Sequence, residues 1–104
     1  MGGNHTTPDA ACPDCGNVQD HRPLRSGGWI RLEPEPQLPT AAVPEQHRWF
    51  ITADGYAVDG HGSDPNCYIA HYRVCSRRPH PEHMHPVFTA IWLRNCARDG
   101  IPFD

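Results

Sequence analysis

The stretch Cys12-Pro13-Asp14-Cys15-Gly16 is the part of the sequence around which this chain is expected to fold. Two thiolates separated by two residues can bind one tetrahedral metal ion from a single turn. A glycine at position 16 permits the backbone angle that points nearby amides at the sulfurs. A redox pair has the same spacing, but pairs of the thioredoxin type lie where a strand runs into a helix. The prolines before and within this stretch, and the Gly-Asn that ends it, therefore favour a metal knuckle over a redox pair or two inert thiols.

The second pair of ligands is expected from Cys67, His71 and Cys75, which recur at every fourth residue. This spacing puts all three side chains on one side of a helix, and equally on one side of a strand. The aromatic and β-branched residues between them favour a strand, along which Cys67 and Cys75 are far apart at about 3.3 Å per residue unless the chain bends. The alternative for Cys67 is a small buried core residue. We predict a zinc site formed by Cys12, Cys15, His71 and Cys75, with Cys67 as the substitute for His71.

The composition of the 104-residue chain also indicates that something besides the core stabilises the fold. Hydrophobic residues make up 38% of the chain, and 12 prolines and 9 glycines break regular structure into short pieces. A small domain with so modest a core folds more readily when a metal ion or a covalent cross-link also holds the chain together. Five cysteines are an odd number, which argues against a disulfide framework and for metal chemistry.

Charge and hydropathy argue against two classes of binding partner, nucleic acids and membranes. The formal net charge is -3 and no long basic run exists, so generic phosphate binding has little electrostatic support. Residues 1–11 are polar and lack the basic start and apolar run of a signal peptide. No apolar stretch is long enough to span a bilayer. We therefore expect a cytoplasmic protein without a membrane partner.

Turn and proline signals predict an irregular first half. Ser26-Gly27-Gly28 predicts a turn before a short strand at 29–32. Four prolines lie between residues 33 and 46, and the missing N–H and fixed φ of each exclude a helix or a central strand. This stretch is expected to be an extended connection, held to the core by Leu38 and Val43.

A hairpin and a helix are expected in the second half. Residues 47–52 are rich in aromatic and β-branched side chains, which favour a strand. Asp54-Gly55 then predicts a two-residue turn with positive φ at both positions and a return strand at 56–58. Residues 86–98 form the one convincing helix, with proline at its first position and Gly100 as its stop. Its apolar face is Phe88, Ile91, Trp92 and Cys96.

Two alternative interpretations depend on other residues. His80, His83 and His85, with Glu82 between them, could hold a catalytic or transport metal and make the protein a metalloenzyme. Prolines at 79, 81 and 86 break any regular presentation of these side chains, which favours a solvated linker. The three tryptophans are expected to anchor the core, although stacking on bases would instead suggest a nucleic-acid-binding zinc ribbon.

The order of these motifs resembles a known family. CPDCG at 12–16, VPEQHRW at 43–49, a hairpin and CYIAHYRVC at 67–75 are similar to small actinobacterial proteins of the domain-of-unknown-function family 6083. The chain has Ala70 before the histidine and Ser76 after the last cysteine where the family pattern has prolines. The resemblance implies a zinc-ribbon-like module with no established activity.

These observations lead to one prediction for the whole chain. Residues 1–11 are expected to be a disordered tail and residues 12–104 a single zinc-binding domain. The fold class is α+β, a small zinc-ribbon-like antiparallel sheet with one C-terminal helix. The expected function is a structural-zinc module without catalysis that binds another macromolecule, more plausibly a protein than a nucleic acid.

Overall fold

The computed structural model describes residues 10–34, 37–60, 64–79 and 84–102, and in these ranges the chain forms three small antiparallel strand pairs and one α-helix. The pairs are β1–β2, β3–β6 and β4–β5. This arrangement confirms the α+β class with short antiparallel strands and one C-terminal helix. The strands are β1 (Asp20–Pro23), β2 (Trp29–Leu32), β3 (Leu38–Pro39), β4 (Trp49–Ile51), β5 (Ala57–Asp59) and β6 (Asn66–Cys67); the 3-10 turns are η2 (Thr40–Ala42), η3 (Glu45–His47) and η4 (His71–Arg73); the helix is α1 (Pro86–Asp99).

The first hairpin follows the N-terminal knuckle. Its pairing runs from Asp20 opposite Leu32 to Pro23 opposite Trp29. Gly27 and Gly28 have φ of 96° and 84°, so the predicted turn lies between the strands. The chain already packs before Cys12, within the stretch predicted to be a tail. Ala10 is buried and its carbonyl accepts a hydrogen bond from the N–H of Gln19, whereas residues 1–9 lie outside the described ranges.

The second hairpin joins β4 and β5 close to the predicted positions, but its turn differs from the prediction. Within this turn only Gly55 has a positive φ, at 92°. Elsewhere among the described residues, positive φ occurs at glycines alone. The N–H of Gly55 donates to the carbonyl of Thr52, and the N–H of Thr52 donates to the carbonyl of Tyr56. The connection is therefore a three-residue loop that ends in a left-handed glycine, rather than a two-residue turn with both positions left-handed.

The segment from Cys67 to Cys75 is not the continuous strand that its composition predicts. Only Asn66 and Cys67 form β6, and Tyr68 and Ala70 make single bridges to Trp49 and Leu32. The chain then bends into η4, whose three residues begin at His71. This bend brings His71 and Cys75 closer to each other than they would be along a continuous strand.

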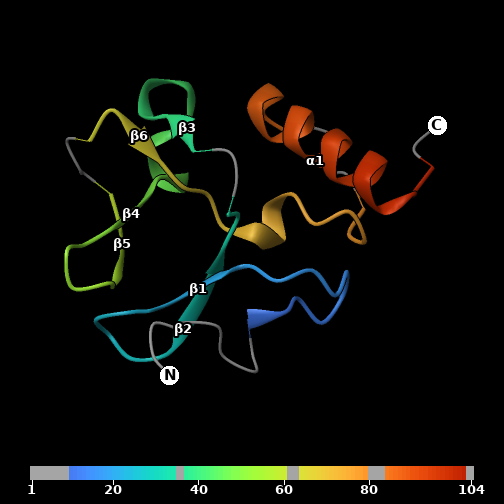
Figure 1. Cartoon of the computed structure of the whole chain (residues 1–104). Helices are drawn as coiled ribbons and strands as arrows, with labels where there is room; N and C mark the ends of the chain where they lie inside the picture. Colours follow the sequence, from blue (N-terminus) through green and yellow to red (C-terminus); the bar gives the residue numbers. More distant parts are fainter. Residues whose placement is uncertain (1–9, 35–36, 61–63, 80–83, 103–104) are drawn as a thin grey trace.

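Helix α1 covers one side of this irregular framework. Figure 1 shows it as a single rod lying above the gold segment that contains η4. It ends at Gly100, whose φ of 69° is left-handed as predicted. The described ranges contain no helix both long and apolar enough to span a membrane. Phe88 and Ile91 from α1 join the core with Leu38, Val43, Phe50, Cys67, Ile69 and Val74.

The tryptophans do not all anchor that core. Trp92 packs against it in a partly buried position, and Trp49 is half-buried in β4. Trp29, however, is 55% exposed, which corrects the expectation that it would be a core anchor. It is at the start of β2, paired with Pro23 beside the turn of a hairpin that has two strands in the described part of the chain.

Candidate metal centre

Four side chains from two distant segments converge at one point. They are the four ligands predicted from the sequence: Cys12, Cys15, His71 and Cys75. Their ligand atoms all lie within 4.8 Å of one another. The cluster therefore joins the N-terminal knuckle to η4 and the residues directly after it.

The spacing of these atoms fits a tetrahedral ion. The Sγ atoms of Cys12 and Cys75 are 3.8 Å apart, and the Sγ of Cys15 is 3.5 Å from Nε2 of His71. Metal–sulfur bonds of about 2.3 Å and metal–nitrogen bonds of about 2.0 Å give tetrahedron edges of about 3.8 Å between sulfurs and about 3.5 Å between sulfur and nitrogen. The donor set and its dimensions thus suit a bound metal ion.

The knuckle is built by local backbone hydrogen bonds. The N–H of Gly16 donates to the carbonyl of Cys12, and the N–H of Cys12 donates to the carbonyl of Asn17. Gly16 takes the left-handed conformation, with φ of 79°. The N–H of Asp14 points at the Sγ of Cys12 over 3.4 Å, as expected for an amide that stabilises a thiolate.

The second half of the site is held by strand β2. The N–H of Glu33, just beyond β2, donates to the carbonyl of Ile69, and Leu32 bridges Ala70. These contacts fix the chain immediately before η4. They also place the side chain of Glu33 next to the imidazole of His71.

Glu33 orients the histidine. Its Oε1 lies 2.7 Å from Nδ1 of His71, and the two side chains are each 2% exposed. A proton on Nδ1 leaves Nε2 with its lone pair free to face the cysteines, which is the tautomer a metal requires. From the sequence alone we predict Asp20, Asp59 or a backbone carbonyl as the acceptor for the free ring nitrogen of His71, and the structure shows Glu33 instead. Asp20 instead pairs with Arg22, and Asp59 is exposed on β5.

Helix α1 contributes a second support from its inner face. The amide nitrogen of Asn95 donates to Oε2 of Glu33 over 3.2 Å and to the carbonyl of Val74 over 3.0 Å. Asn95 is fully buried although it lies on a helix predicted to show only apolar residues inward. It therefore ties α1 to both the carboxylate and the backbone beside Cys75.

The end of α1 is fastened to the site by Asp99. Its carboxylate accepts hydrogen bonds from the side chains of Ser76 and Asn17, which follow the two cysteine-bearing segments. Arg98 donates to the same carboxylate. Hydrogen bonds from Arg98, and with smaller effect from Ser76 and Asn17, hold the pKa of Asp99 well below its usual range.

The thiols of the cluster differ in how readily they ionise. Burial raises the pKa of Cys12, but N–H groups of Cys15 and Asp14 act in the opposite direction and the net effect is a lowered pKa. Burial first, then the neighbouring thiols of Cys12 and Cys15, raises the pKa of Cys75 to about 12. Thiolates this close repel one another, and a cation among them reverses that repulsion.

The remaining candidate residues lie elsewhere. Cys67 is fully buried in the core on β6, so it is a packing residue and not a fourth donor to the cluster. Cys96 is fully buried on α1, as its helical spacing predicts. His85 caps α1 by accepting a hydrogen bond from the N–H of Val87. His80 and His83 lie outside the described residues.

Comparison with known proteins gives one match. No curated protein and no solved structure matches the chain. The model of a family of unknown function, DUF6083, matches residues 4–100, which include the knuckle, the histidine segment and α1. The chain, with its cluster of three cysteines and one histidine, therefore belongs to the DUF6083 family.

Proposed function

We propose that this chain is a small zinc-binding module in which the metal is structural, and that the module binds another protein without catalysing a reaction. The observation that carries the proposal is the convergence of three sulfurs and one imidazole nitrogen within 4.8 Å. Thiolate and imidazole ligands in tetrahedral geometry are typical of zinc.

The number of protein ligands supports a structural role. Catalytic zinc sites keep an open position for water or substrate, whereas structural sites are closed by four protein side chains. Cys12, Cys75 and His71 are buried, and Cys15 is half-buried, so little of the ion would be accessible. A zinc ion held in this way would contribute to folding and not to chemistry.

The position of the cluster supports a role for the metal in folding. The knuckle and η4 are separated by more than fifty residues, and the described residues between them form short strand pairs and 3-10 turns. The main apolar cluster among the described residues has eight members, and none of them comes from the knuckle. Zinc would bind the N-terminal segment to the rest of the molecule where apolar packing is weak.

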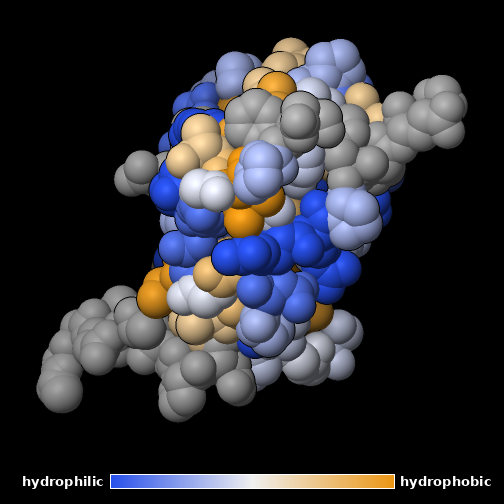
Figure 2. All heavy atoms as spheres, turned by 90° about the vertical axis from the view of Figure 1, so that its right-hand side faces the viewer, coloured by the Kyte–Doolittle hydropathy of each residue, from blue (hydrophilic) through white to orange (hydrophobic). Residues whose placement is uncertain are grey.

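An exposed aromatic side chain supports a protein partner. Trp29 is 55% exposed and its ring stacks on His21, with 4.7 Å between ring centroids. Exposed tryptophans held in one orientation are frequent anchors of protein interfaces. The face in Figure 2, by contrast, shows a hydrophilic band with only small, separate hydrophobic groups above and below it. We therefore assign partner binding to the β1–β2 hairpin.

The metal content of the purified chain tests the first part of the proposal. The chain should contain one zinc ion per molecule when it is produced in zinc-supplemented medium, and the Cys12→Ser variant should contain none. A second zinc ion per chain would instead favour a metalloenzyme that uses His80, His83 and His85. A chain that folds fully without metal would contradict the structural role.

The interface is tested by paired variants. Trp29→Ala should lose the proteins that the wild-type chain retains from a lysate of the native host. Leu93→Ala removes another exposed apolar side chain, on α1, and should retain them. Equal retention by both variants would show that the hairpin is not the binding surface.

A further inference from the structure

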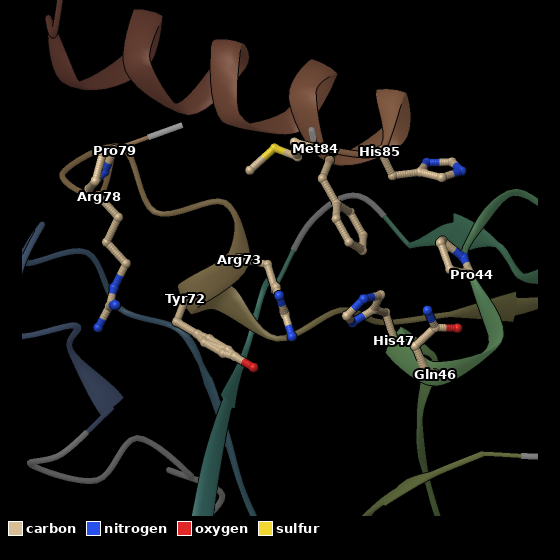
Figure 3. A pocket seen from close by; sticks show the side chains of 10 residues that line it. Pro44, Gln46, His47, Tyr72, Arg73, Arg78, Pro79, Met84 and His85 are labelled. Carbon is tan, nitrogen blue, oxygen red and sulfur yellow. The ribbon is translucent and has the colours of Figure 1, made fainter. Parts of the chain in front are cut away.

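A pocket of about 910 Å³ lies between η3, η4 and the first turn of α1. Figure 3 shows side chains from all three elements around it. Pockets of several hundred Å³ are the size that proteins use for small molecules. The pocket contains none of the four metal-site residues, so it is a separate feature of the fold.

The charged side chains among the described residues that line this pocket are arginines. Arg73, Arg78, His47 and His85 line it, and the described lining residues include no aspartate or glutamate. This pair of arginines contrasts with the formal net charge of -3 for the chain. Burial, and after it the repulsion from Arg73 and His85, lowers the pKa of His47, so this imidazole is neutral at neutral pH and the arginines carry the positive charge.

The two arginines are not equivalent. Arg78 already pairs with Asp14, with 3.3 Å between Nε and the carboxylate oxygen, and its guanidinium lies 6.0 Å from the ring centroid of Tyr72. Arg73 has no carboxylate partner among the described residues. Its guanidinium lies 5.0 Å from the ring centroid of Tyr72, on the side toward His47 (Figure 3). Arg73 is therefore the cation best placed to meet a ligand.

Flat and apolar surface lies beside that cation. Tyr72 is 47% exposed and lines the pocket together with Met84 and two prolines. Phe88 also lines the pocket, and its ring lies edge to face with that of His47, with 5.2 Å between ring centroids. A ligand in this pocket would thus meet an aromatic ring and a guanidinium side by side.

We propose that this pocket binds a small organic anion in which a carboxylate or phosphate group is attached to a flat apolar group. The acidic group pairs with Arg73, whose planar guanidinium can donate two parallel hydrogen bonds to an oxyanion. The flat group lies against Tyr72 and Met84. A cationic ligand of the same shape is rejected by the arginines.

Titration of the full chain, prepared with zinc, tests this assignment by two-dimensional NMR. The probes are phenyl phosphate, benzoate, inorganic phosphate and benzylamine. Phenyl phosphate, benzoate or both should give saturable shifts at residues around the pocket, which identifies the preferred acidic group. Inorganic phosphate should bind more weakly than phenyl phosphate because it lacks the ring, and benzylamine should not bind.

Matched variants assign the binding to particular residues. Arg73→Gln should weaken anion binding about tenfold or more, the loss expected for a charge-assisted hydrogen bond. Arg77→Gln removes the same charge from an exposed side chain that does not line the pocket, and should change the affinity by less than about twofold. Tyr72→Leu, at an exposed position, should abolish the preference for phenyl phosphate over inorganic phosphate while the fold stays intact. Equal losses in the Arg73 and Arg77 variants, benzylamine binding as tight as that of the anions, or no saturable shift with any anion would each overturn the proposal.

Discussion

The carboxylate of Glu33 is hydrogen-bonded to Nδ1 of His71 over 2.7 Å, and both groups are buried beside three cysteine sulfurs. The carboxylate fixes which imidazole nitrogen carries the proton, and so which one is free to bind a metal. This contact connects the proline-rich connection, the η4 turn and, through Asn95, helix α1. Glu33 belongs to no recognisable sequence motif, but its role in the site can be measured.

Replacement of Glu33 should weaken metal binding without removing a ligand. We expect Glu33→Gln to lower zinc affinity by about 10- to 100-fold, because the imidazole loses its charged acceptor. Competition with a chelator of known affinity measures this. Asp59→Asn is the matched control, since it removes an exposed carboxylate from β5 and should leave the affinity unchanged. Equal affinities in the two variants would show that Glu33 does not orient His71.

Removal of the metal should unfold the chain. Ligand thiolates are not preorganised in an unfolded chain, so the binding energy of structural zinc, on the order of 10 kcal/mol, becomes folding energy. Addition of a strong chelator should collapse the near-UV circular dichroism of the tryptophans, and added zinc should restore it. An unchanged spectrum and melting temperature after complete zinc removal would contradict the structural role of the ion.

Cobalt substitution should count three sulfurs. The intensity of thiolate-to-cobalt charge-transfer absorption grows with the number of sulfur ligands, and we expect the value for three. Cys67→Ala should leave it unchanged, because Cys67 lies in the core on β6, while His71→Ala should weaken metal binding. Cys96→Ala should also keep the spectrum and cost about 1 kcal/mol in packing. A four-sulfur spectrum that falls to three in Cys67→Ala would show that the ligand set is wrong.

Loss of the Asp99 charge should destabilise the attachment of α1. The pKa of Asp99 is lowered in the folded chain, so its carboxylate stabilises the fold above the pKa it has when unfolded, and this contribution is lost only as pH falls through the lowered value. At neutral pH the contribution is fully present. Asp99→Asn should therefore cost about 1–3 kcal/mol, measured by urea unfolding with saturating zinc. The control Asp59→Asn removes an exposed carboxylate from β5 and should not move the midpoint.

Features that depend on neighbouring residues could be predicted from the sequence. The CxxC-Gly knuckle forms through hydrogen bonds within six residues, and α1 begins at a proline and ends at a left-handed glycine as its sequence indicates. Its apolar spacing also places Phe88, Ile91 and Cys96 inward correctly. The four residues that converge were found because CxxC and His-x3-Cys spacings restrict which side chains can share an ion.

Features that depend on contacts between distant segments required the tertiary structure. Residues 68–75 have the composition of a strand, but bridges to Leu32 and Trp49 end at Ala70 and the chain turns into η4 instead. Glu33 follows β2 in a proline-rich stretch, and the hydrogen bond from its N–H to Ile69, together with the Leu32–Ala70 bridge, brings its carboxylate to His71. The sequence thus determined which residues can bind a metal, because ligand chemistry and local turns are short-range. The tertiary structure decided which carboxylate supports them and which tryptophan stays exposed, because strand pairing and burial depend on residues far apart in the chain.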